Sequence, residues 1–189
     1  MGVLDFIKSG IKKILGVESS RSDAPFVQWH HRNQTRTHCP LCVFNDRRIF
    51  ENNNEKPLIG PDNHMFCECK YVDVQQKSIG SISGKGILSP DVYLSAYNKL
   101  PNYYITKEEA MALGWRQGKN LEHFAPGKMI GGDIYKNKPP ILPEKEGRIW
   151  RECDVDYEGL KRNSKRLYYS NDGLMFYSPD HGKTFYYVN

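Results

Sequence analysis

From residue 129 onward, the chain alternates short, aromatic-rich apolar runs with turn-forming residues, and this pattern constrains the fold more than any other. Such short runs, separated by Pro, Gly, Asn and Asp, are typical of β-strands. The pattern therefore predicts consecutive strands joined by turns. The runs span residues 129–135, 148–154, 165–170, 174–178 and 184–188.

Helical signals come before these strands. A first helix is predicted at residues 90–97, and a second begins with Thr106 and Glu109, which have the spacing of a capping box, and ends at Gly114. A further helical turn is predicted at residues 121–124. Helices followed by consecutive strands predict an α+β domain with an antiparallel sheet.

The N-terminal half has a different organisation. Residues 1–17 show apolar side chains at helical spacing between lysines, which predicts an amphipathic helix that docks on protein or on a membrane surface. Residues 26–76 form a small Cys/His module, and the Gly/Ser-rich residues 77–89 form a linker to the domain at 90–189. No stretch approaches the roughly 18 apolar residues of a membrane span, and the start does not resemble a secretory signal.

Two cysteine pairs lie in the small module. Cys39 and Cys42 form a C-x2-C pair, and Cys67 and Cys69 form a C-x-C pair preceded by His64. Zinc prefers four thiolate or imidazole ligands in a tetrahedron, so the four cysteines predict a structural zinc site, with His64 as an alternative to one of the second pair. Incidental thiols are the competing interpretation. Residues 37–70 also resemble the cysteine pattern of phage head-morphogenesis proteins.

Four polar residues near the C-terminus are suited to phosphodiester chemistry. They are Glu152, Arg162, Arg166 and His181. A carboxylate base, a histidine acid and two guanidiniums are what metal-free cleavage of a phosphodiester needs. The net charge of +5 fits an anionic partner such as RNA, although many ordinary proteins share it.

Several segments in register resemble the barnase family of bacterial guanyl-type ribonucleases over residues 90–189. This resemblance implies helices packed on a five-stranded antiparallel sheet. It also implies metal-independent cleavage within RNA, in which the 2′-hydroxyl attacks the adjacent phosphorus and leaves a 2′,3′-cyclic phosphate. The segments are KLPNYYITKEEAMALGW (99–115), KNLEHFAPGKMIGGDIYKN (119–137), GRIWRECDVDY (147–157), KRNSKRLYYSND (161–172) and DHGKTF (180–185).

The resemblance also implies roles for individual residues. Glu152 matches the general base and His181 the general acid, whereas Lys107, Arg162 and Arg166 match the cations that bind the phosphate. No cofactor is implied for catalysis.

The matched base-binding loop differs from the family pattern. Asn137 and Lys138 keep its outline, and Asp133 is expected at the rim of the site, but Pro139 stands where the family has a glutamate that reads guanine. Gly182 follows the catalytic histidine, where the family has an aromatic residue. These departures predict a weakened or altered guanine preference.

Two further expectations concern structural residues. Because neighbouring strand residues point to opposite faces, Cys153 is predicted to face the core if Glu152 faces the cleft. Arg148 and Asp172 are predicted to form a salt bridge between two strands.

Three functions are compatible with the whole chain. The first is a delivered ribonuclease toxin that acts on RNA, with a barstar-like acidic inhibitor as partner. The second is a phage- or prophage-encoded structural protein with the ribonuclease domain as an accessory. Phage head or toxin-delivery proteins are further expected partners. The third is a zinc-bearing RNA-binding module with an inactive nuclease fold. The sequence assigns no compartment: specialised secretion, phage association and action in the cytoplasm of a target cell all remain open.

Overall fold

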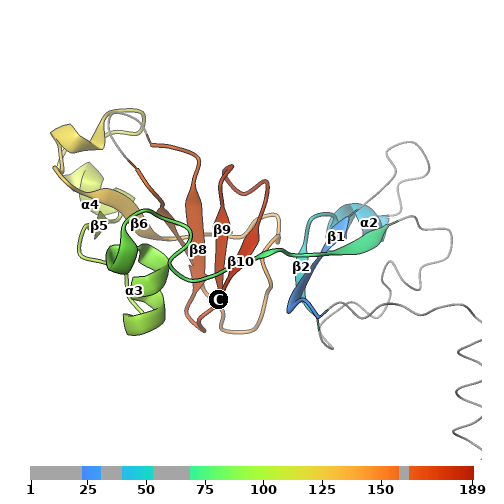
Figure 1. Cartoon of the computed structure of the whole chain (residues 1–189). Coiled ribbons are helices and arrows are strands. Elements are labelled where there is room, and N and C mark those ends of the chain that lie inside the picture. Colours follow the sequence, from blue (N-terminus) through green and yellow to red (C-terminus); the bar gives the residue numbers. More distant parts are fainter. Residues whose placement is uncertain (1–22, 31–39, 53–68, 158–161) are drawn as a thin grey trace, which may run out of the picture.

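The computed structural model describes residues 23–30, 40–52, 69–157 and 162–189. The predicted helix at 1–17 lies outside these ranges, and none of the described helices is long and apolar enough to cross a membrane. Two sheets and several short helices make up the fold (Figure 1). In chain order the elements are β1 (Phe26–His30), α2 (Pro40–Asn45), β2 (Ile49–Glu51), β3 (Lys70–Asp73), β4 (Gln76–Lys77), η1 (Gly86–Leu88), α3 (Pro90–Tyr97), β5 (Tyr104–Ile105), α4 (Lys107–Ala112), η2 (Leu121–His123), β6 (Met129–Ile134), β7 (Trp150–Asp154), β8 (Arg166–Ser170), β9 (Met175–Ser178) and β10 (Tyr186–Val188).

The larger sheet has seven strands in the order β4-β10-β9-β8-β7-β6-β5, so the expectation of five strands needs correction. The strands β6 to β10 are the five predicted from the sequence, and each is antiparallel to its neighbour. Two short strands add to the edges and pair in parallel, β5 with β6 and β4 with β10. Strand β4 comes from before the α+β domain and extends the edge that β10 would otherwise expose.

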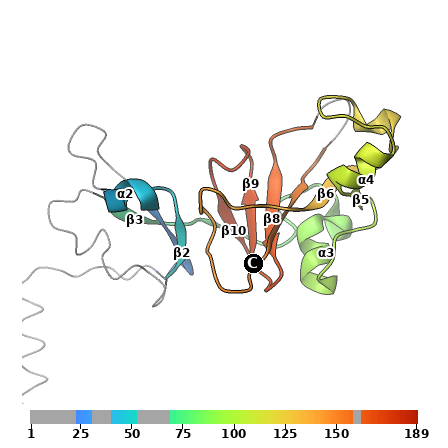
Figure 2. The same cartoon turned by 180° about the vertical axis from the view of Figure 1, so that it is seen from behind.

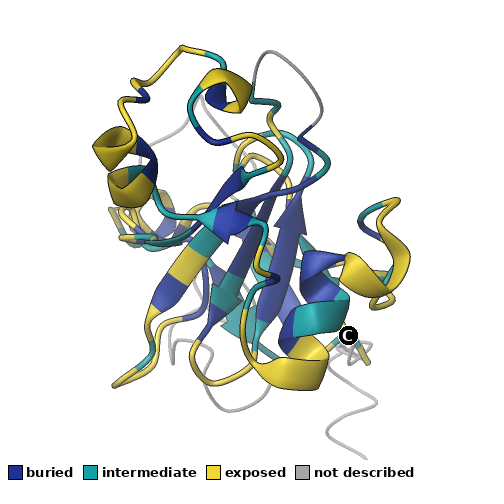
Figure 3. Ribbon diagram, turned by 90° about the vertical axis from the view of Figure 1, so that its left-hand side faces the viewer, coloured by how far each residue is buried: buried dark blue, intermediate teal, exposed yellow. Residues whose placement is uncertain are grey.

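Helices α3 and α4 cover one face of this sheet. Thr106 and Glu109 form the predicted capping box at the start of α4, because each side chain accepts a hydrogen bond from the other residue's backbone N–H. Leu94 and Ala110 pack from the helices onto Leu167 and Cys153 of the strands. Cys153 is buried in this core, as alternation along the strand predicted. Seen from the helix side, the central strands are buried and the outer helix surfaces are exposed (Figure 3).

The N-terminal strands lie on the side of the sheet away from the helices, as Figures 1 and 2 show. They form a three-stranded sheet in the order β2-β1-β3. Phe26 and Ile49 of this small sheet join a second core with Trp150, Tyr168 and Phe176 of the large sheet. The Phe26 and Phe176 ring centroids lie 5.1 Å apart in an edge-to-face arrangement. The small sheet therefore completes the core on this face.

Ion pairs and hydrogen bonds also connect the two parts. The predicted salt bridge is present, with Arg148 Nη2 at 2.8 Å from Asp172 Oδ2, and the same nitrogen lies 3.2 Å from Glu51 Oε1 of β2. Within the predicted linker at 77–89, Gly80 N–H donates to Asp91 and the Ser83 hydroxyl donates to Asp156. These bonds hold the connection against the C-terminal part of the chain.

Candidate active site

Strands β6 and β7 present neighbouring carboxylates. Glu152 pairs across the sheet with Tyr168 of β8 and Asp133 of β6, so all three lie at neighbouring positions of one face. Cys153 points to the opposite face, where burial raises the pKa of its thiol. A buried thiol held in its neutral form is a poor nucleophile, and this excludes Cys153 from the chemistry of the site.

Lys107 is brought to Glu152 by the start of helix α4. Its Nζ lies 2.7 Å from Glu152 Oε1 and 4.0 Å from Asp133 Oδ2. The backbone N–H of Lys107 also donates to the Asp133 carboxylate, at 3.1 and 3.2 Å from its two oxygens. Capping of α4 by Thr106 fixes this first turn, so the capping box and Asp133 together set the direction of the lysine.

A buried carboxylate organises both predicted arginines. Asp154 is 1% exposed, and its two oxygens accept from Arg162 Nε at 2.6 Å and Nη2 at 2.7 Å. Burial disfavours the charge on Arg162, but hydrogen bonding and attraction from Asp154 outweigh it and raise the arginine's pKa. Asp154 was not singled out from the sequence. Its position two residues after Glu152, on the same strand face, is the signal that could have identified it.

Arg166 is buried beside Asp154. It is 3% exposed, and its Nη1 donates to the carbonyls of Asn163 and Lys165, both at 2.7 Å. Its Nε lies 3.1 Å from Asp154 Oδ1 without the alignment of a hydrogen bond. In this arrangement Arg166 and Arg162 share the Asp154 carboxylate.

His181 lies exposed at the tip of the turn between β9 and β10. Its backbone adopts a φ of 62°, and its N–H donates to the Ser164 carbonyl at 2.9 Å. Asp180 Oδ1 accepts from the N–H of Lys183 and of Thr184, at 3.1 and 2.7 Å. Slight burial opposes ionisation of Asp180, but hydrogen bonds from Thr184 and its neighbours prevail and lower its pKa. Side chains and backbone of the same domain therefore contribute to holding the turn.

One pocket of about 250 Å³ brings four of the five predicted catalytic residues together. Lys107, Glu152, Arg162 and His181 line it, whereas Arg166 does not. A carboxylate, an imidazole and two cations around one hollow can bind a phosphodiester, accept a proton from an attacking hydroxyl and donate a proton to the leaving oxygen. Met111, Trp115 and Gln117 complete the wall.

Hydrogen bonds within the predicted base-binding loop hold its shape. The Asn137 side chain accepts from the N–H of Ile141 and Leu142 and donates to the Leu142 carbonyl, at 2.9 to 3.0 Å. Asn137 is 6% exposed, so its amide is used to shape the loop. Lys138 and Pro139 are exposed beside it.

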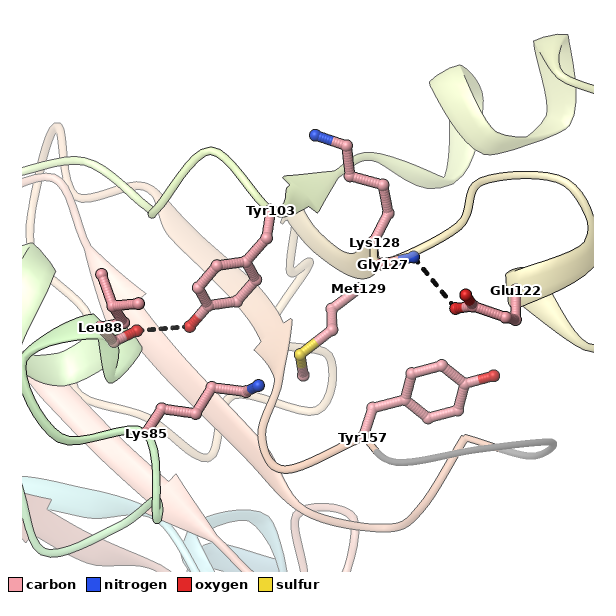
Figure 4. A pocket seen from close by; sticks show the side chains of 8 residues that line it. All are labelled: Lys85, Leu88, Tyr103, Glu122, Gly127, Lys128, Met129 and Tyr157. Carbon is pink, nitrogen blue, oxygen red and sulfur yellow. Dashed lines mark hydrogen bonds between the residues drawn. The ribbon is translucent and has the colours of Figure 1, made fainter.

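A larger hollow of about 390 Å³ contains none of the predicted catalytic residues. Figure 4 shows Lys85, Tyr103, Lys128 and Tyr157 around it. Its polar groups already have partners in the protein: the Tyr103 hydroxyl donates to the Leu88 carbonyl, and Lys128 Nζ donates to the Asn102 carbonyl. This hollow lacks the acid–base pair of the smaller pocket.

The proposed zinc ligands are only partly described. Cys39, His64 and Cys67 lie outside the described residues, whereas Cys42 is buried in α2 and Cys69 is half-buried before β3. In the described part of the chain, no group of three or more His, Cys, Asp or Glu residues could hold a metal ion.

Comparisons with known proteins match the part of the chain that holds this pocket. The profile of the ribonuclease family matches residues 89–189. The chain belongs to this family. It is thus a barnase-like endoribonuclease, as the sequence predicted.

Individual ribonucleases show the same similarity. A ribonuclease of Heyndrickxia coagulans is 50% identical over 94 residues, which are 49% of this chain and 86% of that protein. The ribonucleases of Bacillus intermedius and Bacillus pumilus are also 50% identical over 94 residues, but the match spans only 58% of their length. The solved structure of ribonuclease Sa2 with guanosine-2′-cyclophosphate is 23% identical, with a TM-score of 0.28, over 49% of this chain and 89% of that one. The family match leaves residues 1–88 outside the ribonuclease domain.

Proposed function

We propose that this ribonuclease cleaves RNA by transesterification, with Glu152 as general base and His181 as general acid. Glu152 takes the proton of a ribose 2′-hydroxyl, and the oxygen forms a bond to the adjacent phosphorus. The bond from phosphorus to the 5′-oxygen breaks, and His181 protonates that oxygen. The products are a 2′,3′-cyclic phosphate and a free 5′-hydroxyl.

The observation that supports this mechanism most directly is the shared pocket. Glu152 and His181 line the same hollow, with the cations of Lys107 and Arg162 beside them. The cations would bind the phosphate oxygens and stabilise the negative charge that develops on them, an effect worth about 3–4 kcal/mol for one well-placed donor. Lys107, bonded to Glu152, would also hold the base in place.

The test compares wild-type protein with Glu152→Ala and His181→Ala on an RNA oligonucleotide in EDTA. General acid or base catalysis contributes about 100- to 10,000-fold, so each variant should lose at least about 100-fold in rate. Glu146→Ala, which removes an exposed carboxylate outside the pocket, should keep the wild-type rate. A 2′-deoxy substitution at the cleavage site should block the reaction. Wild-type protein without activity in EDTA would contradict the proposed mechanism.

The chain's biological setting is a separate proposal. The partly exposed Lys107 and Arg162 present positive charge at the pocket, and this favours a barstar-like acidic inhibitor that covers the site. Such an inhibitor would accompany a delivered toxin. Expression of wild-type protein should stop growth of a bacterial host, and Glu152→Ala should not. The phage alternative depends on residues 37–70, of which 37–39 and 53–68 lie outside the described residues.

The base-binding loop supports a relaxed base preference. Pro139 offers no carboxylate to the guanine edge, and the Asn137 amide is engaged within the loop. Lys138, exposed at the same loop, is the side chain best placed to meet the nucleotide. We therefore place nucleotide binding at the loop backbone and Lys138, with Asp133 acting through Lys107.

A further inference from the structure

The N-terminal module contacts the turn that carries His181. Arg47, between α2 and β2, donates from Nη2 to the carbonyl of Gly182 at 2.7 Å and to the carbonyl of Lys183 at 2.9 Å. These are the two residues that follow the proposed general acid. They belong to the ribonuclease domain at 89–189, whereas Arg47 lies outside it.

Arg47 is itself fixed by the small sheet. Its N–H donates to the Trp29 carbonyl at 2.7 Å, and its carbonyl accepts from Gln28 Nε2 at 2.8 Å. Its backbone φ is 66°, a left-handed conformation that costs a non-glycine residue about 1–2 kcal/mol. The surrounding bonds maintain this conformation, and Trp29 is fully buried in the module. The guanidinium therefore extends from a rigid base.

The backbone of this turn adopts conformations that need contacts to hold them. His181 and Gly182 both have positive φ, 62° and 81°, and the backbone of His181 is held there against its own preference. On the inner side, Ser164 and Ser178 accept from the N–H groups of His181 and Gly182. A Cβ at Gly182 would lie 3.3 Å from the Tyr168 hydroxyl, so a larger residue would crowd that contact. Arg47 adds hydrogen bonds to the carbonyls of Gly182 and Lys183.

We propose that Arg47 is a positioning residue for catalysis: through the carbonyls of Gly182 and Lys183, it holds the turn that presents His181 to the pocket. This inference rests on the proposed role of His181 as general acid. It assigns to the N-terminal module a positioning role in the reaction of the ribonuclease domain. Because Arg47 acts through an acid that protonates the leaving group, its loss should lower kcat and leave KM nearly unchanged.

The first measurement compares Arg47→Ala, Arg47→Lys and Arg48→Ala on a dinucleotide RNA substrate. A misplacement of about 1 Å in a reacting group can cost about 100-fold, so Arg47→Ala should lower kcat about 10- to 100-fold. Arg47→Lys keeps a cationic donor and should recover part of the rate. Arg48→Ala removes a neighbouring cation that pairs with Glu144 instead, and should match wild type. Equal losses in the Arg47→Ala and Arg48→Ala variants would contradict the proposal.

The second measurement separates positioning from a general loss of structure. In a His181→Ala background the acid is absent, so adding Arg47→Ala should cost less than about twofold more; such non-additivity identifies residues that act through one another. A substrate with a nitrophenolate leaving group needs little protonation, so both single variants should lose far less on it than on the dinucleotide. If Arg47→Ala lowers the rate by the same factor in both backgrounds and on both substrates, Arg47 does not act through His181. If His181→Ala keeps the wild-type rate, the proposed function itself fails.

Discussion

The buried carboxylate of Asp154 binds the guanidinium of Arg162 through both of its oxygens, at 2.6 and 2.7 Å. The pair aims Arg162 into the pocket, since Asp154 is fixed within strand β7. Arg166 lies against the same carboxylate, with its Nε 3.1 Å from Oδ1, the oxygen that also accepts from Arg162 Nη2. One buried charge thus holds two cations that repel each other.

Substitution Asp154→Asn should weaken both folding and catalysis. Removing one partner of a buried ion pair costs about 3–5 kcal/mol, which urea denaturation would measure. We expect kcat/KM to fall at least about tenfold, because Arg162 loses its direction. Asp156→Asn is the matched control, since Asp156 bonds Lys165 and Ser83 and not the two arginines. An unchanged kcat/KM in Asp154→Asn would contradict this role.

Low pH should weaken the ion pair between Arg148 and Asp172. Burial raises the pKa of Asp172, but hydrogen bonds from Arg148 and Ser170 and the charge of Arg148 outweigh this effect, so the pKa is lowered. A carboxylate with a lowered folded-state pKa stabilises the protein fully above its unfolded pKa of about 3.9, and this stabilisation is lost as the pH falls through the folded pKa. Urea denaturation from about pH 5 downward should show a shallower decline in Asp172→Asn than in wild type. Parallel curves would contradict the assignment.

The shared core predicts that the small sheet and the ribonuclease domain unfold together. Phe26 is 3% exposed and packs on Phe176 and Tyr187, so Phe26→Ala should cost about 3–5 kcal/mol. Scanning calorimetry should show one transition at a lower temperature. Phe44→Ala, which removes a ring that is 62% exposed in the same module, should have a small effect. Two transitions, of which only one responds to Phe26→Ala, would indicate that the two parts fold independently.

We expect zinc to bind to the N-terminal module and to have no part in RNA cleavage. We expect the rate of RNA cleavage to stay the same in EDTA over short incubations, because both proton transfers are assigned to side chains. Mass spectrometry should find about one zinc per chain in wild type and less in Cys42→Ser, if the four cysteines bind metal as their spacing predicts. Wild-type protein purified without chelators and free of zinc would remove the zinc site from consideration.

Base preference is the remaining prediction. A good side-chain contact to a base is worth about 1–3 kcal/mol. Because Pro139 stands where the family has a glutamate, the preference for guanine should be about 5- to 150-fold weaker than in the family. Cleavage mapping on a mixed-sequence RNA should show cutting after several bases, with products that end in 2′,3′-cyclic phosphate. Strict cutting after guanosine would show that another group reads the base.

The local elements could be predicted from the sequence because their signals are local. The capping box at Thr106, the turns and the five central strands all follow from residues a few positions apart, and the structure has them within two residues of the predicted bounds. The opposite directions of Glu152 and Cys153 also follow from alternation along one strand. Family motifs added the expected roles of Lys107 and His181.

Other features depend on contacts between distant segments, which no local pattern encodes. The depth of Arg166 and the dual role of Asp154 arise where strands β7 and β8 meet. The edge strand β4, the Phe26 core and the bonds from Arg47 to Gly182 and Lys183 join residues more than 100 positions apart. The sequence by itself determined the type of domain, its elements and its membership of the ribonuclease family. Only the tertiary structure decided that the N-terminal module packs on the catalytic face, because burial and hydrogen-bond geometry exist only once the chain has folded.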